Sequence, residues 1–185
     1  MKTEKDKMLA GEIYFANDKV LVSERTKAKK LLHKLNVTEY LMNGNARNII
    51  HQLMPNAHKR LYIEPPFHCD YGYNIYSGEN VYFNVNCVVL DTMKVTIGDN
   101  VFFGPGVHVY TATHPLDAIE RRTDEFSKPV SIGDDCWIGG NAVICPGVTI
   151  GKGCTIGAGS VVTKDIPDHS LAVGNPAKVI RKLNE

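Results

Sequence analysis

The chain has 185 residues and a mass of 20.5 kDa, enough for a single domain with a hydrophobic core. Its 21 basic and 20 acidic residues leave a formal net charge of +1, which argues against a nucleic-acid-binding protein, and its 43% of hydrophobic residues excludes wholesale disorder. No apolar run approaches the roughly 18 residues of a membrane span. Because the first residues, MKTEKDK, also lack the apolar stretch of a signal peptide, we expect a cytoplasmic protein that binds no membrane.

Glycine and proline mark a change of character near residue 60. Residues 1–60 contain only Gly11, Gly44 and Pro55, whereas the rest of the chain contains 14 Gly and 8 Pro. We therefore divide the chain into a helical N-terminal segment, 1–60, and a second domain, 61–185.

Two amphipathic helices are predicted in the N-terminal segment. The first follows Asn17 or Asp18 as its cap and carries apolar residues at helical spacing, which are Leu21, Ala28, Leu31, Leu32 and Leu35. The second ends at Pro55 and carries a stripe formed by Ile49, Ile50, Leu53 and Met54.

A six-residue repeat fills much of the second domain. Branched aliphatic residues recur without a miss at Ile132, Ile138, Ile144, Ile150, Ile156 and Val162. Glycine follows most of them, and the fifth position of each repeat is nearly always small. The same register appears earlier at Ile97, Phe103 and Val109.

Neither a helix, with period 3.6, nor an alternating strand, with period 2, produces this pattern. A coil of three flat faces does, because each hexapeptide forms one face, its aliphatic residue points inward and a small residue turns the corner. Such coils of 18 residues stack as parallel strands about 4.8 Å apart. We predict a mainly β protein, a parallel β-helix, in which Cys87, Cys136 and Cys154 at the fifth position are packing residues.

The repeat is interrupted once, after Val109. A charged loop, 115–131, is extruded before regular coils resume at Ile132, and His114 stands at its base. Function should lie where a scaffold's regularity breaks, and histidine titrates near neutral pH. His114 is therefore the candidate general base.

Other departures from the repeat lie within two coils of this loop. Asn84 occupies a corner where the repeat prefers Gly, and the spacing places it roughly 5–10 Å from His114 along the coil axis. It is either a site residue or a residue that tolerates the conformation of the turn. Trp137, the only tryptophan, faces outward and either lines a ligand groove or seals a contact between subunits. A group of acidic and aromatic residues either binds a carbohydrate or caps one end of the coil; it consists of Asp70, Tyr71, Tyr73, Tyr76 and Tyr82.

These motifs resemble the maltose and galactoside O-acetyltransferases over almost the whole chain. The resemblance rests on the hexapeptide coils, the loop that opens YTATHP at 110–115, and the ending TKDIP at 163–167 followed by GNPAK at 174–178. It includes AGEIY at 10–14, and CDYGYNI at 69–75 is closer to the maltose branch.

The resemblance implies a left-handed β-helix, a homotrimer with sites between adjacent chains, and direct acetyl transfer from acetyl-CoA to a sugar hydroxyl without an acyl-enzyme or a metal. His114 matches the general base, and Asn84 matches an acceptor-site asparagine that also assists the transition state. Asp70 falls where the galactoside enzymes carry a serine that touches the acceptor, and Tyr82 matches a tyrosine lining that pocket.

On the donor side, Gly140 matches the residue whose backbone N–H meets the thioester oxygen. Matches along the pantetheine and nucleotide groove are Ala158, Thr163 and Lys164, and matches near the CoA phosphates are Lys178 and Arg181.

Two acceptor-binding aspartates of the galactoside enzymes have no direct match. One falls at Thr92, where the adjacent Asp91 is the candidate replacement, and the other falls near Ala16, with Asp18 the nearest carboxylate. These departures concern the identity of the acceptor.

Three other functions are compatible with the repeat. The acceptor of an acetyltransferase could be the hydroxyl of an antibiotic or a lipo-oligosaccharide. A zinc hydratase resembling the γ-class carbonic anhydrases needs three converging imidazoles, whereas only His108 and His114 are close in the repeat. A non-catalytic sugar-binding scaffold would have no affinity for CoA.

Overall fold

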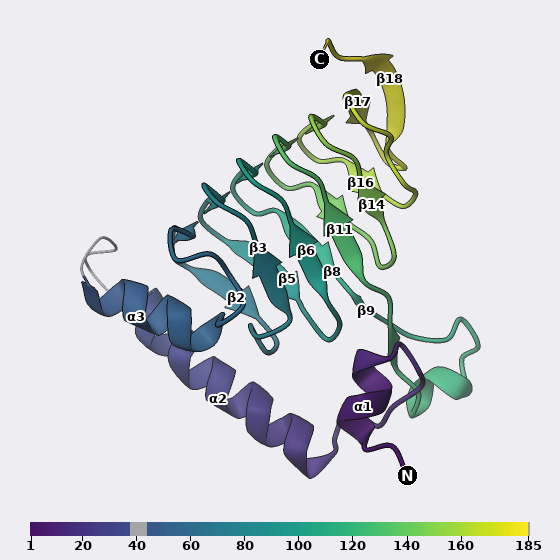
Figure 1. Ribbon diagram of the computed structural model, residues 1–185. Helices are drawn as coiled ribbons and strands as arrows, with labels where there is room; N and C mark the ends of the chain where they lie inside the picture. Colours follow the sequence, from purple (N-terminus) through teal and green to yellow (C-terminus); the bar gives the residue numbers. More distant parts are fainter. Residues whose placement is uncertain (38–43, 185) are drawn as a thin grey trace.

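The computed structural model describes residues 1–37 and 44–184, in which three helices precede a coil of short strands (Figure 1). The helices are α1 (Glu4–Leu9), α2 (Lys19–Asn36) and α3 (Gly44–Leu53). Of the two predicted caps of α2, Asp18 is the one used, because its carboxylate accepts hydrogen bonds from the backbone N–H groups of Val20 and Leu21. None of the helices in the described ranges is long and apolar enough to cross a membrane.

Apart from a two-stranded antiparallel sheet in the extruded loop, the strands of the described residues form three sheets, one on each face of the coil, and these are parallel except at one edge. The first sheet contains β3 (Ile75–Ser77), β6 (Val95–Ile97), β11 (Val130–Ile132) and β14 (Thr149–Ile150). The second contains β1 (Tyr62–Ile63), β4 (Tyr82–Phe83), β7 (Phe102–Phe103), β12 (Trp137–Ile138), β15 (Thr155–Ile156), β17 (Ser170–Val173) and, antiparallel at its edge, β18 (Lys178–Lys182). The third contains β2 (Phe67–Cys69), β5 (Cys87–Leu90), β8 (His108–Tyr110), β13 (Val143–Ile144) and β16 (Val161–Val162).

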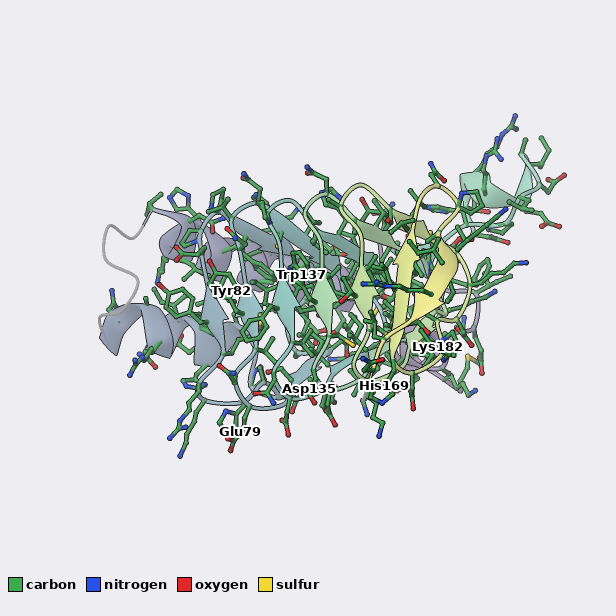
Figure 2. All side chains as sticks on the ribbon, turned by 90° about the horizontal axis from the view of Figure 1, so that it is seen from above. Glu79, Tyr82, Asp135, Trp137, His169 and Lys182 are labelled. Atoms are coloured by element: carbon green, nitrogen blue, oxygen red, sulfur yellow. The ribbon has the colours of Figure 1, made fainter. Side chains whose placement is uncertain are left out.

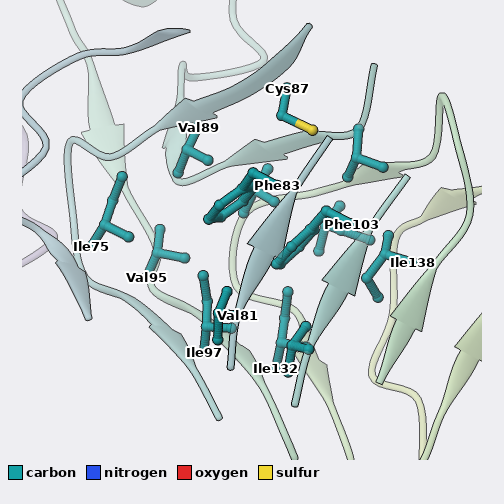
Figure 3. Packing of buried hydrophobic residues seen from close by; sticks show 14 of the residues in the cluster. Ile75, Val81, Phe83, Cys87, Val89, Val95, Ile97, Phe103, Ile132 and Ile138 are labelled. Atoms are coloured by element: carbon teal, nitrogen blue, oxygen red, sulfur yellow. The ribbon is translucent and has the colours of Figure 1, made fainter. Parts of the chain in front are cut away.

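The predicted β-helix is confirmed by the burial of its repeat positions. The six aliphatic residues from Ile132 to Val162 are at most 1% exposed, and Cys87, Cys136 and Cys154 are each 1% exposed, as expected of packing residues. Figure 3 shows how equivalent residues of successive coils stack, with the ring of Phe83 lying on that of Phe103 at 4.3 Å between centroids. One hydrophobic core runs from α2 and α3 into the coil, and the domain boundary near residue 60 stays a prediction.

The early coils are longer than predicted. Tyr62 pairs with Tyr82 and Tyr82 with Phe102, so these coils have 20 residues, whereas Trp137 pairs with Thr155 after the expected 18. The additional residues lie at one corner. We call the turns at 84–86, 104–107, 139–142 and 157–160 the second corner, and those at 70–74, 91–94, 111–129, 145–148 and 163–165 the third corner.

The second and third corners differ in structure. At the second corner, a Cβ on Gly104 would lie 2.6 Å from the backbone nitrogen of Gly140 in the next coil, so only glycine fits. At the third corner, the extruded loop is partly regular: β9 (Ala112–Thr113) pairs antiparallel with β10 (Phe126–Ser127), and the 3-10 helix η1 (Glu120–Arg122) lies between them. The N-terminal segment packs against this hairpin through a bridge between Tyr14 and Glu125 (Figure 1).

Candidate active site

The predicted site residues fall into two groups on one chain. The third corner holds Asp70, Asp91, His114, Thr163 and Lys164, whereas the second corner holds Asn84, Gly140 and Ala158, with Tyr82, Trp137, Lys178 and Arg181 on the adjoining second sheet. The four residues of β5 span the face between the corners, on the order of 13 Å. The predicted separation of Asn84 and His114 refers to the coil axis alone, and on a single chain these two residues also lie at different corners.

His114 is exposed at the third corner and held in a defined orientation. Its Nδ1 lies 3.0 Å from the backbone oxygen of Asp124, across the hairpin in which Thr113 pairs with Phe126. A carbonyl oxygen only accepts hydrogen bonds, so Nδ1 must carry the proton, which leaves the lone pair on Nε2. This tautomer is the one that a general base needs.

Asp91, the candidate replacement for an acceptor-binding aspartate, is buried and bonded to the backbone. Its side chain is 0% exposed, and its Oδ1 accepts hydrogen bonds from the backbone N–H groups of Asp70 at 3.0 Å and Tyr71 at 2.9 Å. Its Oδ2 accepts from the N–H of Asn74 at 3.2 Å. Burial raises the pKa of Asp91 to about 7, against the opposing effect of these backbone N–H groups. Asp91 therefore shapes the turn that carries Asp70.

Asp70 reaches a cavity of about 230 Å³ at the third corner. The lining residues are Tyr14, Ala16, Arg25, Asp70, Thr92 and Glu125. Partial burial raises the pKa of Asp70, and the nearby Arg25 lowers it. Ala16 and Thr92, the two positions at which the resemblance has no matching aspartate, both line this cavity. Neither side chain can supply a carboxylate.

Sequence reasoning missed three of these lining residues, namely Tyr14, Arg25 and Glu125. They come from the N-terminal segment, α2 and the extruded loop, which only the fold brings together. One signal in the sequence could have indicated this corner. Ile75 and Val95 occupy equivalent positions in successive coils but are 20 residues apart rather than 18, so a corner between them is enlarged. A larger cavity of about 480 Å³ lies between the helices and the 71–73 turn, and of the candidate residues only Tyr71 and Tyr73 line it.

Asn84 is not explained by the conformation of its turn. The left-handed residue of this turn is Asn86, with φ of 62°, and Asn84 has no positive φ. The Oδ1 of Asn84 accepts a hydrogen bond from the N–H of Val85 at 2.8 Å, and its Nδ2 donates to no atom in the described part of the chain. This Nδ2 is therefore available to a ligand.

An aromatic column runs along the outer face of the second sheet beside Asn84. Tyr82 stacks on Tyr62 with ring centroids 5.6 Å apart, and Phe102 and Trp137 continue the column in register. Figure 2 shows Tyr82 and Trp137 on the same face of the coil. Trp137 is 58% exposed and Phe102 43%, so the column offers a flat apolar surface.

The predicted donor-side residues offer free polar groups. The N–H of Gly140 donates to no acceptor among residues 1–37 and 44–184, and the exposed Ala158 occupies the equivalent place one coil further on. The basic residues are also exposed, and within the same ranges none forms an ion pair; they are Lys164, Lys178 and Arg181. This arrangement suits a ligand with a carbonyl oxygen at one end and phosphates at the other.

The histidines do not converge as in a zinc hydratase. Nδ1 of His108 is hydrogen-bonded to the hydroxyl of Tyr110 on the outer face of the third sheet, whereas His114 is bonded to the extruded loop. Among the described residues, no three His, Cys, Asp or Glu side chains are grouped so as to hold a metal ion.

Comparison with known proteins adds the family context. Residues 7–57 match the family model of the maltose acetyltransferase hexapeptide capping motif, and residues 129–164 match that of the hexapeptide repeat of succinyl-transferase. A maltose O-acetyltransferase from Clostridium difficile 630 is 50% identical, with a TM-score of 0.97 over 100% of this chain and 99% of that one.

Two further structures contain the donor or its product. A hexapeptide-repeat acetyltransferase from Vibrio cholerae, complexed with acetyl coenzyme A, is 36% identical with a TM-score of 0.91, over 100% of both chains. A galactoside acetyltransferase in complex with coenzyme A is also 36% identical, with a TM-score of 0.95 over 100% of this chain and 92% of that one.

Proposed function

The chain belongs to the maltose and galactoside acetyltransferase family, and we propose that it transfers an acetyl group from acetyl-CoA to a hydroxyl group of a sugar. The observation that carries the proposal is His114, whose Nδ1 is held by the carbonyl of Asp124 so that Nε2 is free to accept a proton. The residue after Asp124, Glu125, lines the polar cavity at the enlarged corner. The complexes of the related enzymes with acetyl-CoA and CoA support the choice of donor.

In the proposed reaction, Nε2 of His114 removes the proton of the sugar hydroxyl as its oxygen attacks the thioester carbonyl. The N–H of Gly140 donates to the oxygen that becomes negative, and Nδ2 of Asn84 is available to the same intermediate. The C–S bond then breaks, and the thiolate of CoA takes the proton back from His114. The products are an acetyl ester and the free thiol, and no acyl-enzyme forms.

The two separate groups of site residues support a homotrimer. If the second corner of one copy faces the third corner of the next, Asn84 and Gly140 of one chain meet His114 and Asp70 of the other. Two different surfaces then pair, and such a contact repeats until the ring closes. The exposed aromatic column beside Asn84 suits both the contact and a sugar ring.

The donor fits the same arrangement. Ala158, Thr163 and Lys164 lie along the coil toward β18, where Lys178 and Arg181 would meet the phosphates of CoA. We further propose that the protein works in the cytoplasm, which keeps thiols such as its five free cysteines reduced.

The test is release of the CoA thiol from acetyl-CoA with maltose, glucose, galactosides and a hydroxylated antibiotic. Sugar-dependent release by the wild type, lost in His114→Ala and retained in His33→Ala on the exposed face of α2, would support reaction and base together. Release with the antibiotic alone would favour the other acceptor class. If acetyl-CoA does not bind, the proposal fails and a sugar-binding scaffold becomes the better hypothesis.

A further inference from the structure

The cavity at the third corner is assembled largely from elements outside the repeat. Tyr14 comes from the N-terminal segment, Arg25 from α2 and Glu125 from the extruded loop, and they meet Asp70 from the coil. Its volume of about 230 Å³ lies below the roughly 300–1,000 Å³ of pockets for drug-sized ligands, so it suits a molecule of about one sugar ring.

The hairpin formed by β9 and β10 connects this cavity to His114, the proposed general base. The carbonyl of Asp124 holds Nδ1 of His114, and the next residue, Glu125, lines the cavity. On its other side, Glu125 is fixed by Tyr14, whose hydroxyl donates to Oε1 at 2.6 Å and whose backbone N–H donates to the carbonyl of Glu125 at 3.0 Å. The position of Glu125 relative to His114 is therefore set by the fold.

The donors in the cavity are largely engaged, whereas the acceptors are free. Nη1 of Arg25 donates to the hydroxyl of Tyr71 at 2.7 Å, and its Nη2 donates to the carbonyl of Ala16 at 2.6 Å. In contrast, Oε2 of Glu125 and both carboxylate oxygens of Asp70 accept no hydrogen bond from the described residues. A ligand that donates hydrogen bonds satisfies these oxygens, and hydroxyl groups do so.

The charges of the lining also select the ligand. Two carboxylates face one guanidinium, and each of these three groups is only partly exposed. Partial burial weakens the screening of their charges by water. The lining carries one more negative than positive group, so it would repel an anionic ligand.

We propose that Glu125 is a specificity-determining residue which, together with Asp70, accepts hydrogen bonds from the hydroxyls of the acceptor and excludes anionic sugars. This inference rests on the proposed function and narrows it. The acceptor class is uncharged sugars and their glycosides, not sugar phosphates.

The experiment compares isopropyl glucoside with glucose 1-phosphate, and the corresponding galactose pair, as acceptors. Both members of a pair keep the same four free hydroxyls and carry a C1 substituent of similar size, so they differ mainly in charge. Wild type is compared with Glu125→Gln, which retains an oxygen for the Tyr14 hydroxyl, and with Glu120→Gln, an exposed residue of η1 outside the cavity.

For the wild type we expect kcat/KM for the phosphate to be at least about tenfold lower than for the neutral glycoside. Glu125→Gln should raise the phosphate-to-glycoside ratio by about three- to tenfold, mainly through KM, and Glu120→Gln should leave it unchanged. Equal use of both acceptors by the wild type, or an unchanged ratio in Glu125→Gln, would overturn the inference while sugar acetylation stands. If no sugar releases CoA, the proposed function itself fails.

Discussion

The second and third corners of this coil show how one repeat supplies two kinds of chemistry. The second corner stays short, and its turns present the free backbone N–H of Gly140 and the side chain of Asn84. The third corner widens into the extruded loop, and buried polar side chains gather there: Asn74, Asp91, Thr92, Thr111 and Ser127. The regular corner thus presents mainly fixed dipoles, and the irregular corner presents a group of polar side chains that includes the carboxylate of Asp91.

The largest expected effect tests whether these corners act together across chains. Asn84→Ala and His114→Ala should each lower kcat by about 10²–10⁴-fold, since each removes one half of a shared site. When the two variants are unfolded, mixed in equal amounts and refolded, about one quarter of the sites should pair two intact halves. The measurement is the rate of thiol release by the mixture relative to the wild type.

The control for this mixing experiment is each variant refolded alone, which should stay inactive. A mixture no more active than its components, with mixed oligomers demonstrated by a tag on one variant, would show that each site lies within one chain.

A smaller effect is expected from moving the backbone dipole of the second corner. A Cβ on Gly140 would lie 3.1 Å from the carbonyl oxygen of Pro105, so Gly140→Ala must shift the turn by a few tenths of an ångström. Because stabilisation of the oxyanion depends on the direction of the Gly140 N–H bond, we expect kcat to fall by about 10- to 100-fold while the melting temperature changes little. An unchanged kcat in Gly140→Ala would contradict the role of its N–H.

The contrast between the corners also explains what the sequence could predict. Local periodicity determines the coil, so residues such as Ile132 and Ile156 predicted the β-helix correctly. The break after Val109 made His114 the candidate base, which stays a prediction. The cavity depends instead on tertiary contacts, for example that of Tyr14 with Glu125, which are 111 residues apart. Asp91 illustrates the same limit, because an acidic residue beside a site resembles a ligand in sequence, whereas only the structure reveals its burial and its backbone partners.

The buried carboxylate of the third corner should make stability depend on pH. The pKa of Asp91 is about 7 in the folded chain against 3.8 for an ordinary aspartate, so the folded state holds this proton more tightly. The stabilisation from Asp91 is then fully present below about pH 4 and is lost as the pH rises through 7. Relative to Asp91→Asn, which does not titrate, the unfolding free energy of the wild type should fall by about 1.4 kcal/mol per pH unit between these limits.

Urea denaturation of both proteins from pH 4.5 to 8 measures this difference. If the difference in unfolding free energy between the wild type and Asp91→Asn instead stays constant from pH 4.5 to 8, the three backbone N–H groups outweigh burial and Asp91 is ionised throughout this range.

The smallest effect concerns the dependence of the third corner on the N-terminal segment. Tyr14→Phe removes only the hydroxyl that donates to Glu125, a bond worth about 1 kcal/mol, so the acceptor KM should rise about fivefold with kcat unchanged. If Tyr14 acts by holding Glu125, the same substitution in a Glu125→Ala background should add no further increase. An equal increase in both backgrounds would mean that Tyr14 contacts the acceptor itself. Either way, the irregular corner would owe part of its specificity to a segment that the regular corner does not need.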